Sequence, residues 1–276
     1  MTTTTTLPSD AISYVCTIVR QRSAIELEAA KAYLIEARLA PLAKRNGYTS
    51  AADLVRDLQT KPKPALQQQV VEAMTTNETS FYRDAHPFEA LRNEIIPALL
   101  ASPNSQRSLN IWSAACSTGQ EAYSIAMLIR EHFPQLNNWR VEILGTDLSD
   151  DVLDKARAGR YSQVEMNRGL PAALSAKYFR RDGMQWELDA QIRGMANFRK
   201  LNLIETWPLI PKMDVVFLRN VLIYFAPEAK KSILAKVRKV MSPHAVLFLG
   251  AAETTIGLDD SFERVQIKNS VFYRLK

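Results

Sequence analysis

The chain has 276 residues, of which 47% are hydrophobic and 23% are charged, and its formal net charge is +6. This composition predicts a globular protein with a substantial core, and the positive charge suits an acidic partner, either nucleic acid or an acidic protein surface. The longest apolar run, residues 245–252, is far shorter than the roughly 20 residues that span a bilayer, so no membrane insertion is expected.

The N-terminus, MTTTTTLPSD, has neither a basic start nor an apolar core, so it does not resemble a signal peptide. We expect residues 1–11 to form a disordered tail. Cys16 and Cys116 lie far apart in the sequence, which favours buried thiols in a reducing cytoplasm over a disulfide framework. The histidines are scattered, so we expect no metal site.

Residues 12–74 have the pattern of an all-helical N-terminal domain. Apolar residues between Ile12 and Ile35 recur at spacings of three, four and seven residues. Asn46-Gly47 predicts the end of one helix, and Ser50 is placed to cap the next. This segment contains no strand pattern.

After Asn110 strands alternate with helices, which predicts a mostly parallel sheet covered on both faces. The expected strands are 109–115, 141–146, 213–218 and 245–249, the expected helices are 120–132, 149–158 and 227–241, and strands 262–267 and 270–275 form an antiparallel hairpin. Residues 75–276 are therefore predicted to form a doubly wound, Rossmann-like α/β domain after the helical one.

Three predicted strand ends carry polar residues, and ligands bind at this edge of doubly wound sheets. In AACSTGQEAYS, residues 114–124, Gly119 turns the chain from strand to helix, either as an ordinary turn or as a site for a polar ligand. Asp147 ends the second strand, where it can accept hydrogen bonds from ribose hydroxyls or cap the helix after Ser149. Arg219-Asn220 ends an apolar strand, and a buried arginine requires a partner.

The stretch TTNETSFYRD, residues 75–84, places polar residues, among them Asn77, Glu78, Thr79, Arg83 and Asp84, around the aromatic pair Phe81-Tyr82. Together with IWSAACSTGQEAYSIA, GTDLS, ARAGRYS and FLRNVLIYF, it resembles the CheR family, the chemoreceptor glutamate methyltransferases of bacteria. The similarity runs from about residue 12 to residue 273, and the opening stretch and RNVLIYF are its most specific parts.

The resemblance implies that S-adenosyl-L-methionine binds across the strand ends and leaves as S-adenosyl-L-homocysteine. The positions that match cofactor contacts of the family are Asn77, Thr79, Arg83, Glu121, Asp147, Asn202, Leu203, Arg219 and Asn220. Phe81 and Tyr82 would anchor the opening stretch against the α/β core. For Arg83 the alternative is a surface ion pair with Asp84 or Glu78.

The implied reaction transfers a methyl group to a glutamate side chain. A glutamate with an ordinary pKa of about 4.3 is already ionised at neutral pH, so the reaction needs no general base. The catalytic candidates are Arg83, which can hold a carboxylate at two points, and Tyr224, which can donate a hydrogen bond to the incoming glutamate. The alternative for Tyr224 is a core aromatic.

The implied partner is the cytoplasmic helical bundle of a chemoreceptor, and the enzyme is expected to be a monomer. A basic face of the helical domain would meet that bundle. Its residues would be Lys31, Arg38 and Arg45, spaced by seven, with Lys44 beside them. Pro41 is expected to kink or end that helix, and the alternative is a solvated face without a partner.

A small antiparallel β-subdomain is expected as an insertion at about residues 160–202. Residues 178–181 and 184–188 form strands joined at Asp182-Gly183, and residues 197–201 form a third strand. Family members that grip a C-terminal receptor pentapeptide resemble this region but have a longer, glycine-bearing loop. The short turn predicts methylation without the pentapeptide, unless another edge of the small sheet accepts it.

Two other functions remain open from the residues themselves. A methyltransferase acting on RNA, another protein or a small molecule is compatible with the basic charge, although no aromatic residues interleave with basic clusters as in RNA-binding proteins. A non-catalytic scaffold that binds S-adenosylmethionine would not need Arg83 and Tyr224. We therefore expect a methyltransferase and no nucleic-acid partner.

Overall fold

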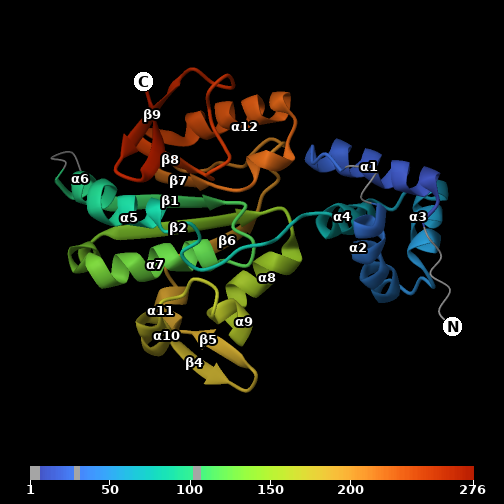
Figure 1. Cartoon of the computed structure of the whole chain (residues 1–276), viewed down its shortest axis with the longest axis horizontal. Coiled ribbons are helices and arrows are strands. Elements are labelled where there is room, and N and C mark those ends of the chain that lie inside the picture. Colours follow the sequence, from blue (N-terminus) through green and yellow to red (C-terminus); the bar gives the residue numbers. More distant parts are fainter. Residues whose placement is uncertain (1–6, 28–31, 102–106) are drawn as a thin grey trace. The chain divides into compact units, whose positions relative to one another are not determined.

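Helices alone make up the N-terminal part of the computed structural model, which describes residues 7–27, 32–101 and 107–276 (Figure 1). They are α1 (Ser9–Ser23), α2 (Ala32–Arg45), α3 (Ala51–Thr60) and α4 (Pro64–Ala73). Val15, Leu54 and Val70 are fully buried among them, so these helices have a core of their own. The predicted all-helical N-terminal domain is confirmed.

The first helix begins earlier than the apolar pattern predicted. Residues 9–11 are helical and not part of a tail, while residues 1–6 of the predicted tail lie outside the described residues. Asp10 lies in the first turn, where a negative charge interacts favourably with the helix dipole, and Ala11 is buried. The apolar pattern starts late because these first residues are small or polar.

The helix α2 does not end at Pro41. It continues to Arg45, and Leu39, Leu42 and Ala43 on both sides of the proline are buried. Proline removes one backbone hydrogen bond, and the packing of this apolar face maintains the helix. The helix ends before Asn46-Gly47, as predicted, with Gly47 in a left-handed conformation at φ +77°.

The larger unit is built on a seven-stranded sheet in the order β6-β2-β1-β7-β8-β10-β9. Its strands are β1 (Ser108–Ala114), β2 (Arg140–Asp147), β6 (Ala196–Lys200), β7 (Met213–Leu218), β8 (Met241–Leu249), β9 (Phe262–Ile267) and β10 (Ser270–Leu275). The first five strands in spatial order are parallel, and β10 is antiparallel to both β8 and β9. The doubly wound α/β prediction and the C-terminal hairpin are confirmed.

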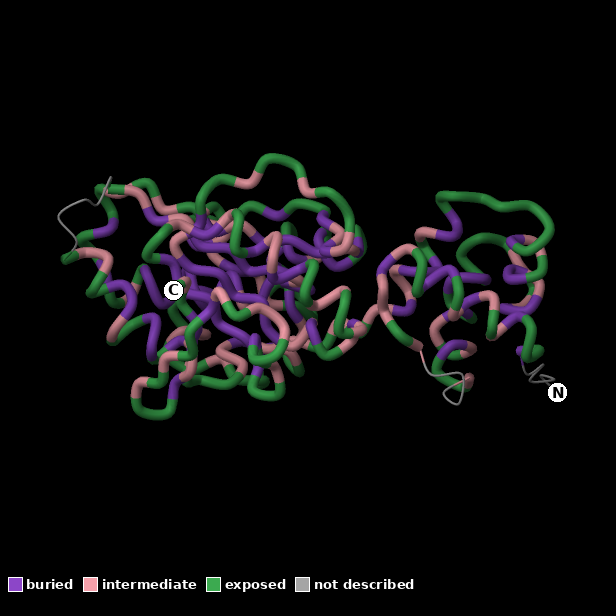
Figure 2. Tube along the Cα trace, turned by 90° about the horizontal axis from the view of Figure 1, so that it is seen from above, coloured by how far each residue is buried: buried purple, intermediate pink, exposed green. Residues whose placement is uncertain are grey.

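Helices cover this sheet, and its strands are the buried centre of the unit (Figure 2). The helices are α5 (His86–Ala90), a π-helical turn η2 (Leu91–Ile95), α6 (Ile96–Ala101), α7 (Gln120–His132), η3 (Pro134–Asn138), α8 (Asp150–Ala158), η4 (Leu222–Tyr224) and α12 (Pro227–Val240). Ile111, Ile143 and Phe217 of the sheet share one core with residues of α5, η2 and α7. The chain leaves β1 toward β2 and leaves β7 toward β8, so the winding reverses between β1 and β7, where such folds bind ligands.

A second, three-stranded antiparallel sheet has the order β3-β5-β4, with β3 (Arg160–Ser162), β4 (Phe179–Asp182) and β5 (Gln185–Leu188). The short helices α9 (Gln163–Met166), α10 (Ala172–Tyr178) and α11 (Ala190–Arg193) accompany it. The predicted hairpin is confirmed, but its turn lies one residue later than the expected Asp182-Gly183. Because Asp182 pairs with Gln185, the turn consists of Gly183 and Met184.

The third predicted strand of this small sheet was assigned wrongly. Residues 196–200 form β6 at the edge of the large sheet, parallel to β2, and β3 takes the place beside β5. Phe198 pairs with Gly145 in this register, and a Cβ on Gly145 would lie 2.5 Å from the Phe198 ring. The glycine therefore leaves room for the aromatic ring that fixes β6 on the large sheet.

The helical unit also contains residues 224–229, far away in sequence. Ile25 and Phe225 form an antiparallel β-bridge, and the Glu26 N–H donates to the Tyr224 carbonyl oxygen at 3.2 Å. The segment that begins at Tyr224 is thus held by the chain between α1 and α2.

Candidate functional site

Asp147 at the end of β2 is the best-enclosed carboxylate at the strand ends, with 7% of its surface exposed. The Ser117 N–H donates to its Oδ2 at 2.9 Å, and the Ser149 N–H donates to its Oδ1 at 3.1 Å. Asp147 therefore both caps the turn that follows β2 and connects it to the turn that follows β1. Ser117 Oγ in turn donates to the Asn77 carbonyl oxygen at 2.8 Å, which brings the opening stretch to the same place.

The turn after β1 is tightly wound. Ala115, Ser117 and Gly119 all have positive φ, and Gly119 reaches +90° at the start of α7. A Cβ on Gly119 would lie 3.0 Å from the Ala156 Cβ, so both the conformation and the close approach require glycine. The predicted strand-to-helix turn is confirmed, and it is anchored to β2 by the Cys116 N–H, which donates to the Thr146 carbonyl.

Arg219 at the end of β7 has the partner that its burial requires, since only 2% of its side chain is exposed. It donates to Glu121 Oε2 at 2.9 Å and to Asp84 Oδ2 at 2.8 Å. It also donates to the Arg83 carbonyl oxygen at 2.8 Å, and Ser113 Oγ donates to Glu121 at 2.7 Å. Among the described residues, nothing accepts from its buried Nε.

The aromatic pair of the opening stretch packs as predicted. Phe81 is fully buried and makes edge contacts with Tyr161 and Phe179, at ring distances of 5.1 and 5.6 Å. Tyr82 packs on Phe88 at 5.2 Å, and its N–H donates to Ser124 Oγ. These contacts fix the backbone that carries Asn77, Thr79 and Arg83.

Arg83 forms no ion pair with Asp84 or Glu78, the two carboxylates offered as its alternative partners. Asp84 pairs with Arg219, and Glu78 pairs with Arg168 at 2.7 Å. The Arg83 guanidinium instead donates to the Glu78 carbonyl oxygen at 2.9 Å. Thr79 beside it is half-buried.

Asn202 and Leu203 follow β6, and the Leu201 N–H donates to the Asp147 carbonyl oxygen at 2.9 Å. The side chain of Asn202 closes a local turn, accepting from the Ile204 N–H and donating to Glu205. The Lys236 ammonium of α12 donates to the Leu203 carbonyl oxygen, so this segment is bound from two sides. Of the predicted cofactor residues, Asp147 ends β2, Asn202 and Leu203 follow β6, and Arg219 and Asn220 follow β7. Glu121 is paired with Arg219.

The sequence-based prediction missed Glu253, which follows β8. Its carboxylate accepts N–H groups of Asn220 and Val221 at 2.8 and 2.9 Å, so it holds the chain directly after Arg219. The stretch AAETT has no periodic pattern, and only the position of an acidic residue just after a strand could have pointed to it.

Tyr224 is half-buried in the helical unit and lines a cavity of about 170 Å³ there, together with Ile35 and Arg38. Arg38 donates to the Met74 carbonyl oxygen at 2.6 Å and to Thr76 Oγ1 at 3.1 Å, so its guanidinium is bonded inside this unit. Lys44 and Arg45 are exposed at the end of α2, and Lys31 lies outside the described residues.

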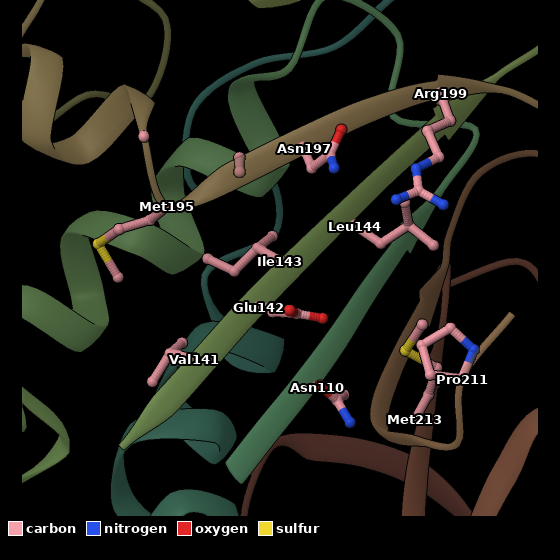
Figure 3. Close-up of a pocket in the computed structure, with 12 residues that line it drawn as sticks. Asn110, Val141, Glu142, Ile143, Leu144, Met195, Asn197, Arg199, Pro211 and Met213 are labelled. Atoms are coloured by element: carbon pink, nitrogen blue, oxygen red, sulfur yellow. The ribbon is translucent and has the colours of Figure 1, made fainter. Parts of the chain in front are cut away.

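A different pocket, of about 260 Å³, lies over the sheet near the starts of β1, β2 and β6 (Figure 3). Asn110, Glu142 and Met195 line it at those starts, and the Arg199 side chain reaches over Leu144 at its upper end. None of the predicted cofactor residues lines this pocket, and ligands of such folds bind at the opposite ends of the strands.

Cys116 is not a candidate nucleophile, because burial raises the pKa of its thiol well above the usual value. Within residues 7–27, 32–101 and 107–276 there is no cluster of three or more acidic, histidine or cysteine residues suited to a metal. In the same part of the chain, no helix combines the length and apolar character needed to cross a bilayer.

Comparison with known proteins extends over both units. Residues 77–271 match the model of the CheR methyltransferase SAM binding domain, and residues 10–75 match that of the CheR methyltransferase all-alpha domain. The chemotaxis protein methyltransferase Cher2 of Pseudomonas putida is 41% identical over 251 residues, covering 89% of this chain and 90% of the relative. Chemotaxis protein methyltransferase 1 of Pseudomonas aeruginosa is 42% identical over 257 residues, covering 91% and 93%.

Among solved structures, a TehB-like SAM-dependent methyltransferase from Corynebacterium glutamicum has 14% identity and a TM-score of 0.39, covering 71% of this chain and 96% of that one. A likeness at this level adds nothing to the assignment, which the family models and the relatives already make. The chain belongs to the CheR family and is an S-adenosylmethionine-dependent methyltransferase.

Proposed function

We propose that this protein methylates glutamate side chains of bacterial chemoreceptors in the cytoplasm, forming methyl esters and S-adenosylhomocysteine. The observation that carries the proposal is the presence of both CheR domains in one chain, the all-alpha domain directly before the SAM-binding domain. The relatives with about nine-tenths mutual coverage are chemotaxis protein methyltransferases. The receptor and the glutamate are what the proposal adds to the family assignment.

The residues at the strand ends suit S-adenosylmethionine. Asp147 is buried and oriented by two backbone N–H groups, which supports its assignment to the ribose hydroxyls. The enclosed Arg219 Nε has no acceptor among the described residues, and a buried N–H without one is costly, which supports a polar ligand or water beside it. When bound, S-adenosylmethionine supplies a methyl group that its sulfonium activates toward a carboxylate oxygen.

The protein's own part is to align and partly desolvate the substrate glutamate. This carboxylate is ionised at neutral pH, so no residue has to remove a proton. Arg83 is proposed to hold a carboxylate of the cofactor or substrate, and Tyr224 to donate a hydrogen bond to the incoming glutamate. The tie between Glu26 and the Tyr224 carbonyl supports a fixed orientation for that tyrosine backbone.

The receptor partner is proposed to dock on the exposed end of α2, at Lys44 and Arg45. Arg38 stays in the proposed surface as a neighbour, although its guanidinium is bonded to Met74 and Thr76. Lys31 is kept in the proposed surface because of its seven-residue spacing from Arg38 in the sequence. An acidic receptor helix is the complementary surface, and we propose that the enzyme acts as a monomer.

The test is to incubate the protein with radiolabelled S-adenosylmethionine and a purified receptor cytoplasmic domain. Label that is released as methanol by mild base identifies a glutamate methyl ester. Arg83→Lys and Tyr224→Phe are expected to lower turnover at least about tenfold, which corresponds to 1.4 kcal/mol of transition-state stabilisation. Label on RNA but not on the receptor, or wild-type turnover in both variants, would contradict the proposal.

We also propose that methylation is independent of a C-terminal receptor pentapeptide. The hairpin β4–β5 closes with the two-residue turn Gly183-Met184, which leaves no longer loop to open for an added strand. A receptor without its C-terminal tail should be methylated as fast as the intact receptor. Heat released on titration of the free pentapeptide at micromolar concentrations would instead indicate that another edge, such as β3, accepts it.

A further inference from the structure

The Glu253 carboxylate gathers backbone N–H groups from two loops at once. Its Oε2 accepts from Gly250 at 2.6 Å and from Asn220 at 2.8 Å. Its Oε1 accepts from Val221 at 2.9 Å and from Ile223 at 3.3 Å. One half-buried side chain after β8 therefore fixes most of the loop that follows β7.

This loop has no regular ladder to hold it. Asn220 has a left-handed backbone at φ +57°, a conformation that asparagine adopts more readily than most residues with a side chain. Backbone N–H groups need acceptors, and a carboxylate is a strong one because its bonds are charge-assisted.

Glycine at position 250 is part of the same arrangement. A Cβ there would lie 2.7 Å from Glu253 Oε2 and 2.9 Å from the Asn220 nitrogen. The absence of a side chain lets the two loops approach closely enough for the carboxylate to reach both. The arrangement is thus built from the end of β8, the strand next to β7.

The loop begins with two residues of the proposed site. Arg219 and Asn220 begin it, and Ile223 is the residue directly before Tyr224. Arg219 is fixed separately by Glu121 and Asp84, so the side chain at the start of the loop does not depend on Glu253. What Glu253 fixes is the backbone between that arginine and the tyrosine.

We infer that Glu253 is a positioning residue for methyl transfer, acting through the loop Arg219–Ile223 and not by touching the substrate. The inference rests on the proposed role of this loop, through Arg219 and Asn220, in the methyltransferase reaction. Without these hydrogen bonds the loop would let Asn220 sample many orientations, and small misplacements of aligning groups cost large factors in rate.

Glu253→Gln tests this with little change in shape. The amide keeps one oxygen acceptor and turns the other position into a donor that faces two N–H groups. The matched control is Asp214→Asn, at the opposite end of β7, where Asp214 accepts the Asn110 N–H at 2.9 Å and Ser242 Oγ at 3.2 Å. Both variants replace by its amide a carboxylate that accepts hydrogen bonds from two other segments, which for Asp214 are the strands β1 and β8.

In the full-length protein, Glu253→Gln is expected to lower kcat for receptor methylation about tenfold or more while the receptor KM changes less than about twofold. Its affinity for S-adenosylhomocysteine, measured by calorimetry, is expected to fall about threefold or more because Asn220 is displaced. Asp214→Asn should keep wild-type kcat and affinity, even if its thermal unfolding midpoint falls by as much as that of Glu253→Gln.

Wild-type kcat and affinity in Glu253→Gln would overturn the inference, as would an equal loss of kcat in Asp214→Asn. Failure of the proposed function looks different, since wild-type protein would then label no receptor. The calorimetric comparison still decides in that case, because a loop held by Glu253 predicts weaker S-adenosylhomocysteine binding in Glu253→Gln than in the control.

Discussion

Arg219 carries a full positive charge into the interior, with only 2% of its side chain exposed. Two carboxylates neutralise it unequally. The Glu121 side chain is 13% exposed, whereas the Asp84 side chain is 47% exposed and partly solvated. A charge that loses a buried partner remains in a poorly solvating environment, so the more enclosed carboxylate should matter more to folding.

Glu121→Gln is therefore expected to lower the free energy of unfolding by about 3 kcal/mol. Asp84→Asn, the matched control, should lower it by less than about 1 kcal/mol because water can take over its role. Urea unfolding without cofactor, followed by circular dichroism, measures both. Equal losses in the two variants would show that enclosure does not decide the contribution.

Among the proposed cofactor residues, Asp147 is expected to contribute strongly to the affinity for the cofactor. Asp147→Ala is expected to weaken S-adenosylhomocysteine binding by about 1–3 kcal/mol, the cost of hydrogen bonds lost from a buried site. Asp150→Ala is the control, since Asp150 is an exposed carboxylate close by that pairs with Lys200. Unchanged affinity in Asp147→Ala by calorimetry would remove this residue from the site.

Individual residues were predictable where a strand ended abruptly. Asp147 ends a predicted strand and Arg219 follows an apolar run, and a buried charge at a strand end requires a partner in any fold. Glu253 was not predictable in this way, because its partner Asn220 lies 33 positions away and offers only backbone. The bonds from Arg38 to Met74 and Thr76 were not predictable either, because these partners lie 36 and 38 positions away.

At the scale of elements, β1, β2 and β7 were predicted to within one residue, whereas β8 begins at Met241, four residues before the predicted start, and the edge strand β6 was assigned to the wrong sheet. In β6 only Phe198 is buried, so the strand has too little apolar pattern to distinguish the large sheet from the small one. What places β6 on the large sheet is the packing of the Phe198 ring on Gly145, where there is no side chain in the way. This depends on a residue of the partner strand and not on β6 itself.

The segment after β6 is tied to α12 by one lysine. The Lys236 ammonium donates to the carbonyl oxygens of Leu203 and Glu205 and lies 5.0 Å from the Trp207 ring centre. Burial lowers the pKa of this ammonium, opposed by the nearby Glu205 charge. The tie holds the chain directly after the proposed cofactor residue Asn202.

Lys236→Met should therefore destabilise the protein by about 1–3 kcal/mol through two lost hydrogen bonds. Lys239→Met is the control on the same helix, because the bonded group of Lys239 is its carbonyl oxygen, which accepts from Lys212. Thermal unfolding of both variants gives the comparison. A loss in Lys239→Met as large as in Lys236→Met would mean that the helix charge, not the tie, is responsible.

The whole molecule carries a net charge of +6, and the exposed end of α2 contributes Lys44 and Arg45 to it. Exposed charges are screened beyond about 8–10 Å at 0.1–0.15 M salt. Docking on an acidic receptor should therefore weaken with salt, while binding in the enclosed cofactor site should change little.

Lys44→Glu is expected to raise the receptor KM about fivefold or more, an effect that added salt should reduce, with unchanged affinity for S-adenosylhomocysteine. Lys61→Glu changes the net charge equally at the exposed end of α3 and should have little effect. Initial methylation rates against receptor concentration at two salt concentrations separate the cases. A salt-insensitive wild-type rate would place docking on another surface.

The assignment of residues 224–229 to the helical unit has a consequence for recombination between family members. A chimera that joins residues 1–76 of one protein to the remainder of another would set the Ile25–Glu26 segment of the first against Tyr224 and Phe225 of the second. Functional exchange of the N-terminal part should therefore require that this distant hexapeptide be exchanged with it. The part that has to be exchanged consists of two separate stretches, residues 1–76 and 224–229, although each family domain is a single stretch.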